Sequence, residues 1–383
     1  MKVKKKLLLA SFTSPLNHNG VSMAVARMEN EMRIRDWEVY VTSCEPDDAS
    51  IKIPHNHFTV PASFNNRINF SDPIINNHLN DWLDSIKTDI IVIHSWLGWP
   101  INILFFYATK NSIPLILMGH GFGAHLMHWV WKPPFFGLAR WLRSWGFVWK
   151  MSRWIPQMAS LVVLGKSPHF FRGVDHWLAN QIRYNRIHTI PNAVKALPKH
   201  PLAFRAVHHL EGKLVLLCVA GFCQRKNQLL VLEAFKRAAI GNSVLVLIGP
   251  EKNDYSEKIL AASKSLSSSV LVLVGLKRIE VESAIQACDV AILGSKSEMQ
   301  PIFLLEAMSE GKPWICTKVG SVDELEGGLI TGQSSRDIAR AICQMNDPAL
   351  RQKLGTMAKS QWQREFQPQT VYDKWNQVLS ESP

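Results

Sequence analysis

Two glutamates with seven residues between them stand in the stretch SEMQPIFLLEAM, residues 297–308. The apolar run before it, residues 290–293, is typical of a buried parallel strand. Pro301 suits the first position of a helix, where its missing N–H costs nothing. The stretch therefore predicts a strand end, a turn and a helix start. Glu298 would lie on the turn, and Glu306 would follow about one turn into the helix.

This turn is suited to hold an anion. The N–H groups of Ile302 and Phe303 would have no acceptor inside the helix and would point beyond its N-terminus. The positive end of the helix dipole would lie behind them, which favours a phosphate or another anion. Glu298 and Glu306 can both border one ligand at this place.

The composition predicts a globular protein with an anionic partner. A chain of 383 residues exceeds a typical single core, so two domains are expected. Hydrophobic residues make up 47% and charged residues 19%, which excludes a disordered chain. The net charge of +12 favours nucleotide phosphates, lipid headgroups or nucleic acid as partners. The six cysteines are scattered without a C-x-x-C pair, which favours a reduced, cytoplasmic protein without a zinc site.

The N-terminus is better interpreted as a strand than as a signal peptide. Its short apolar run, residues 7–10, continues into residues 11–15 without a small-residue cleavage site. Because no stretch of 18 or more apolar residues exists, no transmembrane helix is expected. We therefore expect a cytoplasmic protein whose membrane contact, at the inner face, would be peripheral.

Apolar runs alternate with helical patterns in both halves of the chain. In the first half, the expected strands are residues 7–10, 38–42, 90–94, 115–118, 161–164 and 188–190. In the second half, they are residues 214–219, 243–248, 270–274, 290–293 and 313–317. The helical patterns between them include residues 228–238, 280–287 and 302–309. This alternation predicts an α/β fold with parallel sheets covered on both faces.

The polar stretch 196–211 separates the two sets of strands. We expect two Rossmann-like, doubly wound domains, residues 1–195 and 200–365, with a last helix in residues 366–383 that packs back on the first domain. Ligands of such sheets bind at the carboxyl ends of the strands. The expected place for a ligand is therefore a cleft across which the two domains face each other.

Five segments in the same order resemble family 4 of the retaining glycosyltransferases. The most specific is 297–308 with its continuation, and the full set is 19–22, 119–121, 190–194, 219–228 and 297–324. The resemblance implies a GT-B fold, with an acceptor-binding N-terminal domain and a C-terminal domain that binds a nucleotide sugar. It further implies transfer with retention, no cofactor, and no metal at the diphosphate.

The resemblance also assigns roles to residues. Glu306 would accept hydrogen bonds from the ribose hydroxyls, and Glu298 would face the donor sugar. Lys226 and the backbone of Ile302 and Phe303 would stabilise the diphosphate leaving group, where negative charge develops. Taken alone, each glutamate could be an ordinary helix-start carboxylate, and Lys226 a solvated surface lysine. The expected donor-binding residues are Gly20, Arg225, Lys226, Glu298, Pro301, Ile302, Phe303 and Glu306, and the expected catalytic residues are His120, Glu298 and Lys226.

His120 follows the expected strand 115–118, and glycines on both sides of it allow a ligand to approach closely. In the family, a histidine here touches the transferred sugar, although a lone histidine is more often a structural residue. Gly20 fits a glycine loop at a helix start, where the backbone approaches a diphosphate or an acceptor. His94, His125 and His128 lie near this pattern and have no assigned role.

One residue departs from the family pattern. Many members carry an arginine at the position of Gly221, and this chain has Arg225 beside Lys226 instead. Arg225 would then take over the diphosphate contact, or the site would hold the leaving group more weakly.

The segment 128–154 is rich in tryptophans interleaved with lysines and arginines. Trp141, Trp145 and Trp149 recur at helical spacing, which fits either a core-facing helix or an interfacial surface on an anionic membrane. Because no RNA- or DNA-binding motif accompanies these residues, we expect no nucleic acid partner.

The sequence thus predicts an enzyme: a retaining, metal-independent glycosyltransferase of the hexosyltransferase type. It would move a sugar from a nucleotide-sugar donor to a glycan or lipid-linked acceptor, in bacterial surface polysaccharide biosynthesis by family habit. Two alternatives remain open. One is an enzyme resembling the nucleotide-sugar 2-epimerases, which would need carboxylates for proton abstraction. The other is a catalytically silent relative that only binds a nucleotide sugar.

Overall fold

The computed structural model describes residues 4–17, 20–60, 73–94, 96, 99–120, 138–168, 174–199, 203–264 and 269–382. For Pro73 and for residues 99–100 and 138–144 it describes the backbone alone. The chain divides into two compact units. Unit 1 comprises Met1–Ala193 and Pro368–Pro383, and unit 2 comprises Val194–Gln367.

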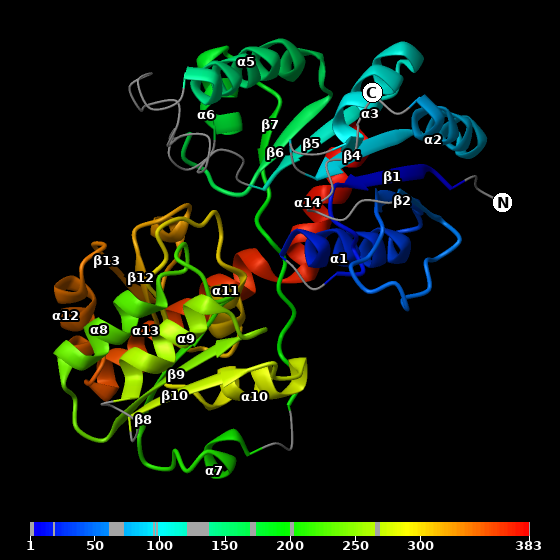
Figure 1. Cartoon of the computed structure of the whole chain (residues 1–383). Helices are drawn as coiled ribbons and strands as arrows, with labels where there is room; N and C mark the ends of the chain where they lie inside the picture. The colour runs from blue at the N-terminus through cyan, green and yellow to red at the C-terminus, as the bar shows by residue number, and fades with distance from the viewer. Residues whose placement is uncertain are drawn as a thin grey trace. The chain divides into compact units, whose positions relative to one another are not determined.

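Unit 1 is built on a parallel sheet of seven strands in the order β3-β2-β1-β4-β5-β6-β7 (Figure 1). The strands are β1 (Lys6–Ser11), β2 (Glu38–Cys44), β3 (His57–Val60), β4 (Ile90–His94), β5 (Leu115–Gly119), β6 (Ser160–Val163) and β7 (Ile187–Thr189). Every residue of β4 and β5 is buried. Such continuous burial is expected where helices cover both faces of a parallel sheet.

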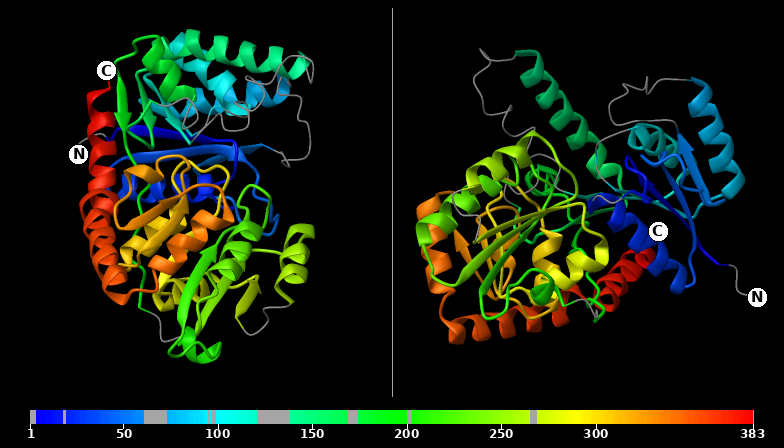
Figure 2. Two further views of the ribbon diagram at one scale, coloured as in Figure 1. Left: turned by 90° about the vertical axis from the view of Figure 1, so that its left-hand side faces the viewer. Right: turned by 60° about the horizontal axis from the view of Figure 1, so that its bottom comes forward.

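The helices of unit 1 are α1 (Gly20–Ile34), α2 (Pro73–Ile86), α3 (Trp99–Asn111), α5 (Leu138–Trp154), α6 (Val174–Gln181) and α14 (Pro368–Glu381), with a 3-10 turn at Ile155–Gln157. Figures 1 and 2 show the C-terminal helix α14 beside α1. Arg35 Nη2 lies 3.0 Å from Asp373 Oδ1, and the indole N–H of Trp37 donates to Asn376 at 2.9 Å. These bonds attach α14 to the turn that follows α1.

Unit 2 contains a parallel sheet of six strands in the order β10-β9-β8-β11-β12-β13. The strands are β8 (Leu214–Val219), β9 (Ser243–Gly249), β10 (Val270–Val274), β11 (Val290–Leu293), β12 (Trp314–Thr317) and β13 (Gly328–Thr331). Its helices are α7 (Phe204–Val207), α8 (Gln228–Ala238), α9 (Asp254–Ser263), α10 (Arg278–Ala287), α11 (Ile302–Ser309), α12 (Ser335–Gln344) and α13 (Pro348–Gln361), with short turns at Val322–Glu324 and Trp362–Phe366. The predicted α/β class with two doubly wound units is confirmed.

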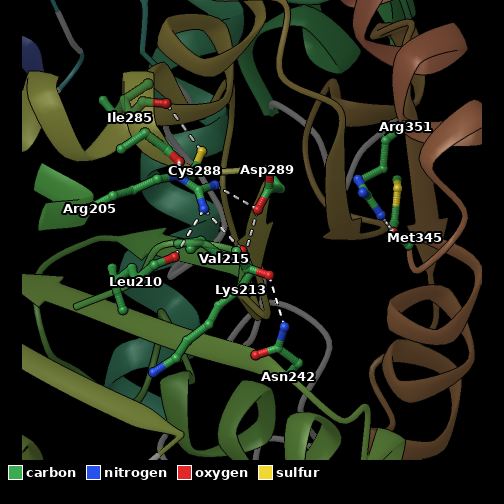
Figure 3. Close-up of polar contacts among 12 residues, drawn as sticks. Arg205, Leu210, Lys213, Val215, Asn242, Ile285, Cys288, Asp289, Met345 and Arg351 are labelled. Atoms are coloured by element: carbon green, nitrogen blue, oxygen red, sulfur yellow. Dashed lines mark hydrogen bonds and ion pairs between the residues drawn. The ribbon is translucent and has the colours of Figure 1, made fainter. Parts of the chain in front are cut away.

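The amino edge of this second sheet is held by one ion pair. Arg205 Nη2 lies 2.8 Å from Asp289 Oδ2, and the N–H of Val215 donates to the same oxygen at 2.7 Å (Figure 3). Arg205 also donates to the carbonyls of Leu210 and Lys213. The acid that precedes the apolar run of β11 therefore joins the starts of β8 and β11 to the preceding loop.

The structure differs from the sequence-based expectations in a few elements. The short strands β3 and β13 were not expected, because four residues at a sheet edge give little periodicity. Pro301 is the residue before α11 and not its first helical position. Its backbone is extended (φ −71°, ψ 108°), and its carbonyl accepts from the N–H of Leu304 at 3.0 Å.

Candidate functional site

The loop after β11, residues 294–301, is held by hydrogen bonds from the last residue of β12 and from the segment after it. The hydroxyl of Thr317 donates to the carbonyl of Ser295 at 2.5 Å. The N–H and the hydroxyl of Ser321 both donate to the carbonyl of Met299, at 2.8 and 2.9 Å. We call residues 294–301 the β11 loop, and these bonds fix the direction in which its side chains project.

Gly320 lets this segment come so close to the β11 loop. Its φ of +53° lies in the left-handed region, which favours glycine. A Cβ atom added here would lie 2.2 Å from the carbonyl oxygen of Met299 and 2.5 Å from that of Glu298. The position therefore excludes every side chain, and the loop geometry depends on it.

Glu298 projects from this loop into a group of cations. Its Oε1 lies 2.5 Å from Lys226 Nζ and accepts from the hydroxyl of Ser295 at 2.8 Å. Its Oε2 lies 3.6 Å from Arg225 Nη1, and the carboxylate is almost fully buried. Arg225 also donates to the carbonyl of Ser297 at 3.1 Å. The structure thus brings the sequence-predicted Arg225, Lys226 and Glu298 into contact.

The turn between β8 and α8 positions the two cations. The N–H groups of Lys226 and Asn227 both donate to the carbonyl of Cys223, and Asn227 is left-handed with a φ of 54°. Gln228, which is fully buried, donates to the carbonyl of Gly221 at 3.0 Å. A buried amide thus fixes the start of the turn, and a tight reversal aims Lys226 at the β11 loop.

Glu306 is buried in α11, four residues after Ile302, the first residue of the helix. Arg278, at the start of α10, lies 2.6 Å from it through Nη2 and also contacts Glu282 at 2.7 Å. Burial opposes the positive charge, yet the two carboxylates together raise the pKa of Arg278 above its ordinary value. The sequence reading missed Arg278, which looks like a surface residue of a charged helix start.

Ile302 and Phe303 are the first two residues of α11. Their N–H groups have no acceptor within the helix, and they face the side where Pro301 and the β11 loop end. Glu298 lies on the loop that leads to this helix start, and Lys226 reaches it from the turn between β8 and α8, so the anion site stays a prediction at this place. In unit 2, the carboxyl edge of the sheet carries all the predicted donor-binding residues except Gly20.

In unit 1, three of the predicted or nearby residues follow the carboxyl ends of adjacent strands. Gly20 begins α1 after β1, His94 ends β4, and His120 directly follows β5. His94 Nδ1 lies 2.8 Å from His120 Nε2, and the two rings are stacked at 22°. Burial lowers the pKa of His94 well below its ordinary value, helped by His120, and it lowers the pKa of His120 to about 4. Both imidazoles are therefore neutral at pH 7.

A buried carboxyl lies beside this pair. Asp175, near the start of α6, accepts from the indole N–H of Trp96 at 3.3 Å, and burial raises its pKa to about 6. A Cβ added to Gly119 would lie 2.1 Å from its Oδ2, so any side chain here would force the Asp175 carboxyl to shift. Asp175 was missed in the sequence, because it looks like an ordinary helix-start acid.

Some expected residues cannot be placed. His125 and His128, with most of the Trp-rich segment before residue 138, lie outside the described residues. Within the described ranges, no three His, Cys, Asp or Glu side chains come together as a metal-binding group. Among the helices that the structure describes, none combines the length and apolar character needed to cross a membrane.

Solved structures share this fold at low sequence identity. The chain is similar to sucrose-phosphate synthase from Thermosynechococcus elongatus, at 18% identity and a TM-score of 0.78, over 99% of both chains. It is also similar to HepE from Anabaena, solved in complex with UDP-glucose, at 14% identity and a TM-score of 0.72, over 98% of this chain and 99% of the other. A lipopolysaccharide 1,2-N-acetylglucosaminetransferase from Salmonella typhimurium is 30% identical over 132 residues. That match spans about a third of each chain: 32% of this one and 35% of the relative.

Two family models account for most of the sequence. Residues 18–196 match the family described as Glycosyltransferase Family 4, and residues 202–361 match Glycosyl transferases group 1. The first covers the sheet of unit 1 from α1 onward, and the second covers the whole sheet of unit 2. The chain therefore belongs to the family 4 glycosyltransferases and has their GT-B fold.

Proposed function

We propose that this protein transfers a sugar from a nucleotide-sugar donor to a glycan or lipid-linked acceptor, with retention and without a metal at the diphosphate. The observation that carries the proposal is the contact of Lys226 with Glu298 on the loop that leads to the N-terminus of α11. A cation, a carboxylate and free helix N–H groups gather at one strand end, as a leaving diphosphate and its sugar require.

The leaving diphosphate would be stabilised by groups of unit 2. Lys226 and Arg225 supply positive charge, and the N–H groups of Ile302 and Phe303 supply fixed dipoles. These groups are held by the fold before any ligand binds, so little reorganisation is needed when charge develops. Arg225 would thereby take the role of the arginine that many family members carry at the position of Gly221.

The nucleoside would be held by Glu306. Its buried carboxylate accepts from Arg278 at 2.6 Å, which fixes its orientation and leaves an acidic group for the ribose hydroxyls. HepE was solved with UDP-glucose, so UDP-sugars are the first donors to test here. Similarity to the lipopolysaccharide 1,2-N-acetylglucosaminetransferase favours a bacterial surface glycan as the acceptor.

The exposed face of α5 would bring the enzyme to a lipid-linked acceptor. Trp145 is 45% exposed and Trp149 is 62% exposed, which contradicts a core role for these two residues. Arg153 lies over the ring of Trp149, and Lys150 over that of Trp154. Aromatic rings beside cations suit the headgroup region of an anionic membrane at the cytoplasmic face.

Liposome sedimentation tests the membrane contact. The double variant Trp145→Ser/Trp149→Ser is expected to bind vesicles of anionic phospholipid at least about fivefold more weakly than the wild type. The control is Ile34→Ser, which removes an exposed apolar side chain from α1. Equal binding by both variants would exclude the face of α5 as the contact.

Release of nucleoside diphosphate tests the activity. UDP-, GDP- and ADP-sugars are incubated with and without an acceptor lipid, and the anomeric configuration of the product is read by NMR. Acceptor-dependent release with retained configuration is expected, and it should persist in excess EDTA. Epimerised donor without an acceptor would identify an epimerase. Binding without any turnover across the panel would identify a silent relative.

A further inference from the structure

Two neutral imidazoles meet at the carboxyl edge of the unit 1 sheet. His94 is 3% exposed and ends β4, where it pairs in register with Ser11 of β1 and Met118 of β5. Its Nδ1 faces Nε2 of His120 at 2.8 Å. A distance this short between two ring nitrogens requires one proton between them, so one ring donates and the other accepts.

The surroundings of His94 decide which ring donates. Its other nitrogen, Nε2, is buried and has no hydrogen-bond partner among the described residues. If His120 donated, Nε2 of His94 would carry a buried N–H without an acceptor. If His94 donates from Nδ1, the same Nε2 is a bare acceptor. An orphaned buried N–H is the rarer of the two.

We propose that His94 is a positioning residue: it donates from Nδ1 to His120 and so fixes His120 as the tautomer protonated at Nδ1. His120 then offers an N–H donor to a substrate oxygen, and it has no free basic nitrogen with which to take a proton. This role rests on the proposed glycosyl transfer, whereas the tautomer itself does not.

The burial of His94 supports this positioning role. The side chain completes a fully buried strand, where an aliphatic residue would pack without leaving a polar atom unpaired. The orphaned nitrogen therefore costs stability, and among the described residues the ring hydrogen-bonds only to His120. Such a local loss of stability is typical of functional sites.

Nitrogen NMR on protein labelled with 15N-histidine tests the tautomer directly. The wild type is expected to show His120 protonated at Nδ1 and accepting at Nε2. His94→Asn places an amide donor where Nδ1–H was and should keep that tautomer. His94→Leu removes the donor and should let His120 adopt a mixture of tautomers. Protonation of wild-type His120 at Nε2, or an unchanged His120 in His94→Leu, would overturn the proposal.

Kinetics separate positioning from folding. His94→Leu is expected to lose about tenfold in turnover, with little change in the donor KM, and His94→Asn should recover most of the loss. The control is His57→Asn, which breaks the pair of His57 with Glu29 in the same unit and should leave turnover unchanged. Equal losses in the Asn and Leu variants would reject the positioning role. If no donor is turned over, the NMR experiment still tests the tautomer of His120 by itself.

Discussion

The two ends of β11 carry two ion pairs of opposite character. Before the strand, Asp289 accepts from the N–H of Val215 and from Arg205, whose guanidinium also donates to three backbone carbonyls. After the strand, Glu298 contacts Lys226, an ammonium with three donors. In the described part of the chain, only Glu298 accepts from that ammonium. The first pair is saturated by the fold, and the second keeps donors for a ligand.

This contrast separates a structural pair from a functional one on one strand. Both pairs join charged side chains that are more than 70 residues apart in the chain. The two pairs differ in the other groups that the cation contacts. At the amino edge, Arg205 also donates to backbone carbonyls, whereas at the carboxyl edge Lys226 keeps donors for a ligand. Removal or addition of a single charge should therefore change stability at the amino edge and chemistry at the carboxyl edge.

The largest effect is expected from Glu298→Gln. Loss of the charge beside Lys226 should lower kcat by about 100- to 1,000-fold while donor affinity falls far less, because charge matters most in the transition state. Steady-state kinetics and calorimetric binding of the donor measure the two quantities. Glu326→Gln, at an exposed pair with Arg364, is the matched control. Equal losses of affinity and turnover would make Glu298 a donor anchor only.

The mirror experiment at the other end is Asp289→Asn. It leaves Arg205 without its counter-charge, so the free energy of unfolding should fall by about 3 kcal/mol, with turnover within about twofold at a temperature where the protein is folded. Urea unfolding and an assay at 15 °C check this, with the exposed Asp254→Asn as control. A large kcat loss in a well-folded Asp289→Asn protein would erase the contrast between the two edges.

The residues at the two edges of the second sheet could be predicted from the sequence to different extents. The alternation of apolar runs and helices predicted both sheets, and the start of α11 after Pro301 was placed within one residue. Glu298 was placed at the turn by its local pattern, whereas Lys226 was assigned to the same site through the family resemblance, since no local pattern links residues 72 positions apart. Arg278 and Asp175 were missed because each resembles an ordinary helix-start charge. Their partners are set by the register of strands and helices, which the sequence does not display locally.

The pairing of His94 with His120 lay closer to prediction. His120 was expected after the strand 115–118, His94 was noted only as a nearby histidine without a role, and β4 and β5 are neighbours in the sheet. The chain alone does not say that residues 26 positions apart meet through Nδ1 and Nε2, because ring orientation depends on packing around each strand end.

In unit 1, the comparison extends to Asp175, a carboxyl whose burial opposes its charge. Its recorded partners are neutral N–H groups, and burial raises its pKa from 3.8 to about 6. The folded chain therefore holds a proton that the unfolded chain releases, so stability is full below about pH 4 and is lost as the pH rises through about 6. The stability of Asp175→Asn relative to the wild type should therefore increase by about 2 kcal/mol when the pH is raised from 4.5 to 8.

Urea unfolding at both pH values measures that gain, and the exposed Asp81→Asn serves as control. A difference that does not change with pH would show that Asp175 is ionised at no cost. That result would exclude a strained carboxyl at this position.

The smallest effect is expected from adding a charge, in Gly221→Arg. A Cβ at Gly221 meets no atom within 4 Å, so the side chain can enter without displacing the fold. A third cation near Lys226 and Arg225 should tighten donor binding by about two- to fivefold, an effect that added salt should weaken. Gly241→Arg, where a Cβ also meets nothing within 4 Å, controls for net charge. Unchanged affinity in Gly221→Arg would mean that Arg225 already supplies the missing charge, because a filled diphosphate contact gains nothing from another guanidinium. A gain shared by both variants would instead reflect the long-range attraction of a more basic protein for an anion.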